Sequence, residues 1–497
     1  MNDKIELSPN KIASYLKKPA EEFTRADLMK FIEENGIKML NFRYVGGDGK
    51  LKLLNFVIND KEHLKKVLSI GERVDGSSLF PHIKACSSDL YVVPRYKTAF
   101  VNPFSEIPAV DVLCSYYTRD GKPLESAPEN VLRKAHRVFK EKTGMTLEAL
   151  GELEYYVYSE LDPIYEITPQ KGYHESHPFS KWEFIRTEIM QVISEIGGRI
   201  KYGHSEVGNI INEDRAYVQH EIEFLPNPVE YAADQLVIAK WVIREVAYKY
   251  GLEVSFAPKI IVGHAGSGLH IHTRVIKDDK NMIADCNGLN DNGKKLIAGM
   301  LGLAGSLSAF GNTVPTSYLR LVPHQEAPTN ICWGDSNRSV LVRVPLGWGS
   351  GVSNMILDAN PAETESTEEY IGNQTVELRS PDGSANVYLL LAGITVAARH
   401  GFENKNSLDV AKKLYVKENV AKNKKLKLPQ LPGSCFEAGD RLLKQRAIYE
   451  KYDVFPENMI DGLAEELKEY KDQDLSEKVY GDGNSLQQIV DEYFHCG

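Results

Sequence analysis

The pattern of hydrophobic and polar positions predicts a small α+β unit at the start of the chain. Thr24, with Asp27 three residues later, predicts the capped start of a helix that ends at Gly36. A Gly-Gly-Asp-Gly cluster between the first two strand-like runs predicts a hairpin turn. The runs that alternate like strands are 38–45, 51–57, 90–93 and 110–117.

Beyond residue 120, strand-like runs mix with long amphipathic helical patterns. The predicted strands are 147–159, 218–225, 254–260, 269–276, 339–344 and 374–379. The predicted helices start near Pro128 and cover 181–196, 229–250, 293–311, 385–400, 435–451 and 458–468. This order predicts a large α/β or α+β body with a helical C-terminal end, and we divide the chain into domains 1–120 and 121–497.

Composition narrows the functional classes. The 497 residues carry a net charge of −10 and no long basic block, which argues against a nucleic-acid or anionic membrane partner. The longest apolar run, 387–398, is too short to cross a bilayer, and the N-terminus lacks the features of a signal peptide. Six scattered cysteines without a C-x-x-C pair indicate neither a zinc site nor a disulfide scaffold. We therefore predict a cytoplasmic protein.

Charged residues stand two positions apart in four of the predicted strands. The pairs are Glu152 with Glu154, Glu221 with Glu223, His270 with His272, and Glu377 with Arg379. Side chains at this spacing share one face of a strand. One such pair is most simply a solvated sheet face, but four pairs in one domain favour a common interior cavity.

Carboxylates that converge in a cavity repel one another. At ~4 Å and an effective dielectric constant near 20, each ionised pair costs about 4 kcal/mol, and a divalent cation relieves that cost. Oxygen ligands with one or two imidazoles suit Mg²⁺ or Mn²⁺ better than zinc. Arg338 and Arg343 stand beside an apolar strand, and Arg320 precedes them. Carboxylate-bound Mg²⁺ with nearby arginines is typical of phosphoryl transfer.

A glycine-rich turn, His264-Ala265-Gly266-Ser267-Gly268, leads directly into the His270 strand. Phosphate loops of the Walker type and dinucleotide fingerprints both need a following helix, so this turn is neither of them.

Taken in order, these segments resemble the glutamine synthetase family over nearly the whole chain. The segments that carry the resemblance are Val74-Asp75-Gly76-Ser77-Ser78, Gly151-Glu152-Leu153-Glu154, Lys171-Gly172-Tyr173, His204-Ser205-Glu206-Val207, Gln219-His220-Glu221-Ile222, Ala265 to His272, Arg320-Leu321-Val322-Pro323, Glu326-Ala327-Pro328, Asn337-Arg338-Ser339 and Glu377 to Asp382. Each is weak alone, but their shared order and spacing are specific to that family.

The resemblance implies an α+β fold with a small β-grasp N-terminal domain. It also implies a large catalytic domain whose curved sheet forms a funnel-shaped site. The expected activity is ATP-dependent ligation of ammonia to the γ-carboxylate of L-glutamate through γ-glutamyl phosphate. The expected assembly is a homo-oligomer of hexameric rings, with active sites between subunits and the Asp75 loop reaching the neighbouring catalytic domain.

The resemblance also implies a role for individual residues. The metal nearer glutamate would be held by Glu154, Glu206 and Glu221, and the metal nearer the ATP phosphates by Glu152, His270 and Glu377. Arg338 would stabilise the transferring phosphoryl group, and Arg343 and His272 would bind ATP.

The resemblance assigns the remaining residues to glutamate and ammonium. Glutamate would be positioned by Glu154, Arg320, Arg379 and the backbone of Gly266. The ammonium pocket would contain Asp75, Ser78, Tyr173 and Glu206. Asp75 would take a proton, and Glu326 would close the site as a flap and help deprotonate the tetrahedral adduct.

The chain departs from the family pattern at four places. Val74 replaces the usual aromatic residue or Leu, and Ala265 replaces an Asn of the flap, which weakens the expected hold on glutamate. Arg274 replaces a Ser near the nucleotide. We expect residues 208–217 to form an unusually long loop, so Glu221 is preferred over Glu213 or Asp214 as a ligand because of its Gln-x-Glu-Ile context.

Two other functions stay open at this stage. The first is a γ-glutamyl ligase that uses an amine or polyamine in place of ammonia, which the departures at Ala265 and 208–217 keep in play. The second is a catalytically inactive structural or regulatory relative. Decay normally removes metal carboxylates first, and here none is missing, so the second is disfavoured.

Overall fold

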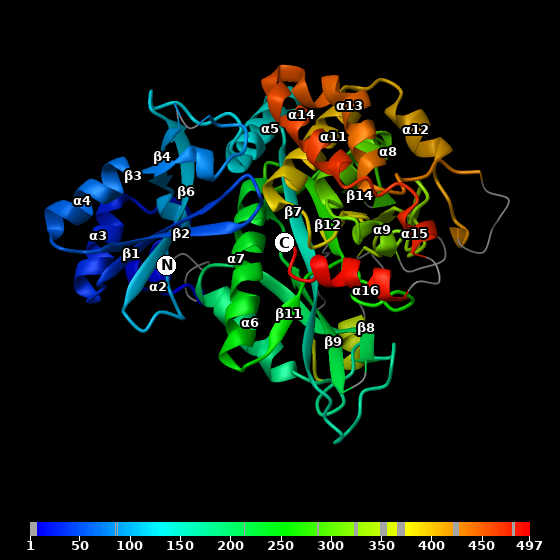
Figure 1. Ribbon diagram of the computed structural model, residues 1–497, viewed down its shortest axis with the longest axis horizontal. Helices are drawn as coiled ribbons and strands as arrows, with labels where there is room; N and C mark the ends of the chain where they lie inside the picture. Colours follow the sequence, from blue (N-terminus) through cyan, green and yellow to red (C-terminus); the bar gives the residue numbers. More distant parts are fainter. Residues whose placement is uncertain are drawn as a thin grey trace.

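A computed structural model of the chain describes residues 7–84, 86, 88–212, 214–285, 288–322, 327–347, 355–364, 373–420, 427–479 and 483–497. Figure 1 shows the N-terminal sheet and its helices on one side of the molecule and the larger mixed sheet, with the longer helices around it, on the other. Each part has its own buried apolar core. The predicted α+β class is therefore confirmed.

The N-terminal part is built on a six-stranded sheet with the order β2-β1-β6-β4-β3, to which β5 is added beside β6. Its strands are β1 (Met39–Val45), β2 (Leu51–Val57), β3 (Glu72–Asp75), β4 (Asp89–Pro94), β5 (Phe100–Val101) and β6 (Ala109–Thr118). Its helices are α2 (Lys11–Leu16), α3 (Arg25–Glu34) and α4 (Lys61–Ile70). The predicted hairpin is confirmed, since β1 and β2 pair antiparallel from Met39↔Val57 to Val45↔Leu51.

Helix α3 begins where the sequence predicts. Thr24 accepts a hydrogen bond from the backbone N–H of Asp27, and the Asp27 carboxylate accepts one from the backbone N–H of Thr24, which forms a capping box. Leu28, Phe31 and Ile32 then recur on one face of the helix and are buried in the N-terminal core.

The larger part is built on a ten-stranded sheet with the order β16-β17-β18-β12-β7-β9-β8. Short strands β10 and β11 are added beside β7, and β13 is added beside β12. The bounds of these strands are β7 (Thr146–Glu160), β8 (Ile200–Asn212), β9 (Arg215–Phe224), β10 (Asn227–Pro228), β11 (Glu253–Ser255), β12 (Leu269–Lys277), β13 (Lys280–Asn281), β16 (Trp333–Asp335), β17 (Val342–Val344) and β18 (Val376–Leu378). A separate two-strand ribbon joins β14 (Ala284–Asp285) to β15 (Gly288–Leu289).

The described α-helices of the larger part range from one turn to about six turns in length. Their bounds are α5 (Pro128–Thr143), α6 (Glu183–Glu195), α7 (Val229–Lys249), α8 (Asp291–Gly311), α9 (Ser317–Arg320), α10 (Met355–Ala359), α11 (Val387–Glu403), α12 (Ser407–Lys413), α13 (Cys435–Glu450), α14 (Glu457–Glu469), α15 (Leu475–Lys478) and α16 (Gly483–Glu492). Helix α7 packs on β7, and α11 packs between α5 and α8. The apolar run that predicted a buried helix forms most of α11, and none of the described helices is long and apolar enough to cross a bilayer.

An ion pair joins the two parts of the molecule. Arg95, which follows β4, donates to both carboxylate oxygens of Asp234 on α7, at 2.7 and 2.9 Å. The Tyr388 hydroxyl on α11 donates to the same carboxylate at 2.6 Å. Such bidentate pairs fix orientation as well as distance, so this contact sets how the segment after β4 lies against α7 and α11.

Two of the predicted elements are wrong. Residues 208–217 are not a long loop, because β8 and β9 pair antiparallel as a hairpin that turns near Asp214. A register shift between Ser205 and Asn209 breaks the alternation of β8, which hid this strand from sequence periodicity. The strand predicted over 254–260 ends at Ser255, and the Pro258 carbonyl accepts from the Ser267 N–H instead of pairing in the sheet.

Candidate active site

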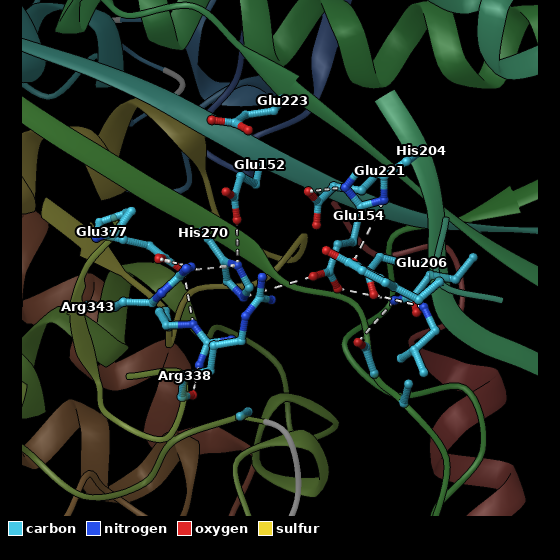
Figure 2. A pocket seen from close by; sticks show the side chains of 18 of the residues that line it. Glu152, Glu154, His204, Glu206, Glu221, Glu223, His270, Arg338, Arg343 and Glu377 are labelled. Atoms are coloured by element: carbon cyan, nitrogen blue, oxygen red, sulfur yellow. Dashed lines mark hydrogen bonds and ion pairs between the residues drawn. The ribbon is translucent and has the colours of Figure 1, made fainter. Parts of the chain in front are cut away.

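A cavity of about 870 Å³ lies over the strands of the larger sheet. All four predicted pairs line it, namely Glu152 with Glu154, Glu221 with Glu223, His270 with His272, and Glu377 with Arg379. The register brings them together, since His270 lies opposite Glu152, Glu221 opposite Glu154, and His272 opposite Glu377. Directly paired residues on one sheet face have neighbouring side chains. Four polar pairs therefore form one charged surface, of which Figure 2 labels Glu152, Glu154, Glu221, Glu223, His270 and Glu377.

One potential metal group contains Glu152, His270 and Glu377. Each offers a ligand atom within 4.8 Å of the others. The Nδ1 atom of His270 lies 2.9 Å from a Glu152 oxygen and 3.6 Å from a Glu377 oxygen. These are the residues that the sequence assigns to the cation nearer the ATP phosphates, and the structure brings all three together.

A second potential metal group contains His204, Glu206 and Glu221, again with ligand atoms within 4.8 Å. Glu206 and Glu221 are the predicted ligands here, but His204 is an addition that the sequence did not suggest. Glu154 lines the same cavity beside this group. Its Oε2 atom accepts from the Gly268 N–H at 2.7 Å and from the Gln219 side-chain amide at 3.1 Å.

A third potential group contains Glu152, Glu223 and His272. The Nε2 atom of His272 lies 2.9 Å from Glu152, and the Lys201 ammonium lies 2.6 Å from Glu223. Because Lys201 already neutralises the charge of Glu223, a bound cation would relieve less repulsion in this group than in the other two.

The charges in the cavity shift the pKa values of its carboxyl groups in opposite directions. Burial, together with the nearby charges of Glu152, Glu154 and Glu206, raises the pKa of Glu221 well above its usual range. Burial also opposes ionisation of Glu152, but the imidazoles of His272 and His270 outweigh it and hold the pKa well below its usual range. Crowded oxygen donors of this kind, with imidazoles beside them, fit a divalent cation.

Four arginines surround the carboxylates. Arg343 and Arg379 donate to opposite oxygens of Glu377, at 3.0 and 2.9 Å. Arg320 donates to the Ser380 carbonyl at 2.8 Å, and Arg338 lines the cavity beside Tyr173. Guanidinium groups that face one cavity suit an anionic ligand such as a phosphate or a carboxylate.

The glycine-rich turn runs along the same cavity. A side chain at Gly266 would collide with the Pro258 carbonyl, because its Cβ atom would lie 2.2 Å from that oxygen. Glycine therefore lets the backbone at 266 pass close to Pro258 while still lining the cavity.

Two predicted residues lie elsewhere in the described chain. Asp75 ends β3 in the N-terminal sheet, where its carboxylate accepts from the hydroxyls of Ser77 and Ser78 at 2.7 and 2.8 Å. These hydroxyls and that of Ser88 lower the pKa of Asp75. Among the described residues that line the cavity, neither Asp75 nor Ser78 is present. Glu326 falls outside the described residues.

Comparison with known proteins identifies the family. The family model for the glutamine synthetase catalytic domain matches residues 125–479, and the model for the glutamine synthetase beta-grasp domain matches residues 36–119. The chain belongs to the glutamine synthetase family. It is therefore an enzyme of the carbon–nitrogen ligase class, and the predicted combination of a β-grasp domain with a glutamine-synthetase-type catalytic domain is confirmed.

Individual relatives agree with this assignment. A glutamine synthetase from Clostridium saccharobutylicum is 30% identical over 466 residues, which cover 90% of this chain and 96% of the relative. A cryo-EM structure of Plasmodium falciparum glutamine synthetase has a TM-score of 0.75 at 19% identity and covers 93% of this chain and 99% of its own. A structure titled "Apo GmaS without ligand" has a TM-score of 0.69 at 18% identity and covers 93% of this chain and 98% of its own. At these identities the two solved structures show the fold alone.

The departures from the glutamine synthetase pattern have clear structural positions. Ala265 lines the cavity, and its backbone is held by the Gln170 side chain and the Tyr156 hydroxyl. Arg274 forms an ion pair with Glu148 at 2.8 Å, and neither residue is among the described residues of the cavity wall. Within the hairpin, Glu221 faces the cavity, whereas Asp214 is exposed at the turn and Glu213 lies outside the described residues.

Sequence reasoning missed several residues of the cavity wall. Lys201, Tyr202 and His204 all lie on β8, the strand that was not predicted. His204 stands two positions before Glu206, the same spacing as in the other pairs. That spacing is the signal for His204 in the sequence, but it indicates a shared face only within a strand, and the periodicity of this segment does not predict one.

Proposed function

We propose that this enzyme joins ammonia to the γ-carboxylate of L-glutamate at the expense of ATP, by way of γ-glutamyl phosphate. The observation that carries the proposal is one cavity in which the first two potential metal groups and four arginines face one another. Phosphoryl transfer to a carboxylate brings two anions together, and this surface supplies the positive charge and the cation ligands that such an encounter needs.

Divalent cations fit the donor atoms of the cavity. Mg²⁺ or Mn²⁺ would be held by Glu152, His270 and Glu377 on one side, and by Glu206 and Glu221 with Glu154 close by on the other. A bound cation would offset the negative charge of the phosphates and of the attacking carboxylate. The raised pKa of Glu221 supports this assignment, because four carboxylates crowd it.

The arginines have distinct tasks in the first step, in which the glutamate carboxylate attacks the γ-phosphate. Arg338 would stabilise the transferring phosphoryl group, and Arg343 and His272 would bind the nucleotide; all three line the cavity. Arg320, Arg379 and the Gly266 backbone would orient glutamate. Fixed orientation and preorganised charge are the main sources of acceleration in phosphoryl transfer.

The second step needs an ammonium pocket that excludes water. Tyr173 and Glu206 lie on the cavity wall, and Asp75 and Ser78 would complete the pocket, with Asp75 taking a proton from ammonium. Glu326 would act as the flap that shields the acyl phosphate from hydrolysis and would help deprotonate the tetrahedral adduct.

We further propose that the active site is shared between subunits of a hexameric ring. The exposed carboxylate of Asp75 lies on the edge strand β3, whereas the cavity is lined by strands of the other sheet. A head-to-tail interface in a closed ring presents one surface of each subunit to a different surface of its neighbour. Asp75 of one subunit would then complete the cavity of the next.

The direct test of the reaction is phosphate release from ATP with Mg²⁺ and L-glutamate, measured with ammonium and with a panel of alkylamines and polyamines. We expect turnover with ammonium and formation of glutamine, because the predicted pocket places two carboxylates around a small cation. The matched control omits glutamate, which should abolish phosphate release. Turnover with an amine but not with ammonium would contradict the proposal and would identify a γ-glutamyl ligase of a different acceptor class.

A further inference from the structure

His204 lies on the wall of the cavity at a point where the family resemblance assigns no ligand. It belongs to β8 and pairs directly with Glu221 on β9. Its Nε2 atom is 3.3 Å from a Glu221 oxygen, and its Nδ1 atom is 3.9 Å from a Glu206 oxygen. Donor atoms that bind one cation at about 2.1 Å in adjacent positions lie roughly 3 Å apart, so the Nε2 spacing fits a shared ion.

The hydrogen bonding of the imidazole determines which nitrogen is available. Nδ1 lies 3.0 Å from the Ser205 carbonyl, which can only accept, so Nδ1 carries the proton. In the neutral ring Nε2 then has a free lone pair, and that lone pair faces the Glu221 carboxylate. A histidine that donates one N–H to a backbone carbonyl and turns the other nitrogen to a group of carboxylates has the usual arrangement of a metal ligand.

Aromatic neighbours hold the ring in this orientation. The His174 ring lies 4.3 Å from the His204 ring, between centroids, and the Tyr173 and Tyr202 rings lie at 5.5 and 5.8 Å. A side chain packed in this way loses little rotamer freedom when it binds an ion, which favours binding.

Glu154 is less available to the same ion. One of its oxygens, Oε2, already accepts two hydrogen bonds, from Gly268 and from Gln219. Its other oxygen, Oε1, lies 4.0 Å from His270, in the direction of the other metal group. Among the described residues, His204 and Glu206 are therefore the ones that lie close enough to Glu221 to share an ion with it.

We propose that His204 is a ligand of the cation bound by Glu206 and Glu221, and that this nitrogen donor makes the site select Mn²⁺ over Mg²⁺. That this cation is the one nearer glutamate rests on the proposed function, but the choice of His204, Glu206 and Glu221 as its ligands does not. Mg²⁺ gains little from imidazole, whereas transition-metal ions bind it with an affinity that starts at Mn²⁺ and rises along the series. The other predicted site, with His270, would share this preference, so the enzyme as a whole would be best loaded with Mn²⁺.

The test compares His204→Phe with His174→Phe in the full-length, metal-free enzyme. Phenylalanine keeps the ring stacking in both variants, but only the first removes a proposed donor. Titration with Mn²⁺, followed by electron paramagnetic resonance, should show one class of site weakened by ~10-fold or more in His204→Phe and unchanged in His174→Phe. Competition with Mg²⁺ should show that His204→Phe loses much less affinity for Mg²⁺ than for Mn²⁺. Unchanged Mn²⁺ affinity, or equal losses for both ions, would overturn the proposal.

A second measurement does not depend on the His204 variant. Electron spin-echo spectroscopy detects nitrogen bound to Mn²⁺, and His270→Phe/His272→Phe removes the imidazoles of the other two metal groups. We expect nitrogen modulation to persist in this double variant, and its absence would overturn the proposal. Neither measurement requires turnover, so an enzyme that binds Mn²⁺ through nitrogen but does not use ammonium would refute only the proposed function.

Discussion

Glu377→Ala is expected to reduce ligase activity by about 10³-fold while the oligomer stays assembled. The Glu377 side chain is 1% exposed, accepts hydrogen bonds from Arg343 and Arg379, and lies 3.6 Å from His270. Its loss removes a proposed metal ligand and leaves two guanidinium groups without their partner. The measurement is phosphate release with saturating ATP, glutamate and ammonium, combined with light scattering for the assembly.

Two further variants make this result interpretable. Glu377→Gln keeps the volume and an acceptor for the arginines but removes the charge, so it should be as inactive as Glu377→Ala and better folded. Glu148→Ala breaks a similar ion pair on β7, with Arg274, outside the described wall of the cavity, and should keep most of the activity. Retained activity in either Glu377 variant would refute the metal assignment.

Mixed oligomers of two inactive variants are expected to regain activity. Asp75→Asn should lower activity by roughly 10²–10⁴-fold, since it removes a proposed general base. Asp75 lies in the N-terminal sheet and Glu377 in the cavity, so in the proposed shared site a Glu377→Ala subunit would still supply an intact Asp75 to the cavity of an Asp75→Asn neighbour. Random mixing in a ring leaves about one quarter of the sites complete, and the measured activity should approach that fraction of the wild-type value.

The control for the mixing experiment pairs Glu377→Ala with Glu152→Ala. Both substitutions lie in the cavity wall of one subunit, so every site in their mixed ring carries at least one of them and no activity should return. If the mixture of Glu377→Ala with Asp75→Asn subunits also regains no activity, then Asp75 does not act in a neighbouring subunit.

Local patterns in the chain were enough to predict most of the secondary structure. The apolar run of α11, the Pro128 start of α5 and the Thr24 capping box each act over a few residues, and all three are found. The failures share a cause, because β8 and the end of the strand predicted over 254–260 depend on pairing with distant residues. The register shift in β8 is one such effect, which no local periodicity can show.

The sequence by itself determined which faces of β7, β9, β12 and β18 carry charge, since side-chain direction in a strand follows from a period of two. It also determined the family, through motifs whose order and spacing resemble the glutamine synthetase pattern, and the family models match the same chain. Only the tertiary structure decided how those charges are grouped, because the register of strands far apart in the chain sets which carboxylate lies opposite which imidazole. For the same reason, only the structure brought His204 to Glu221 and separated Asp75 from the cavity of its own subunit.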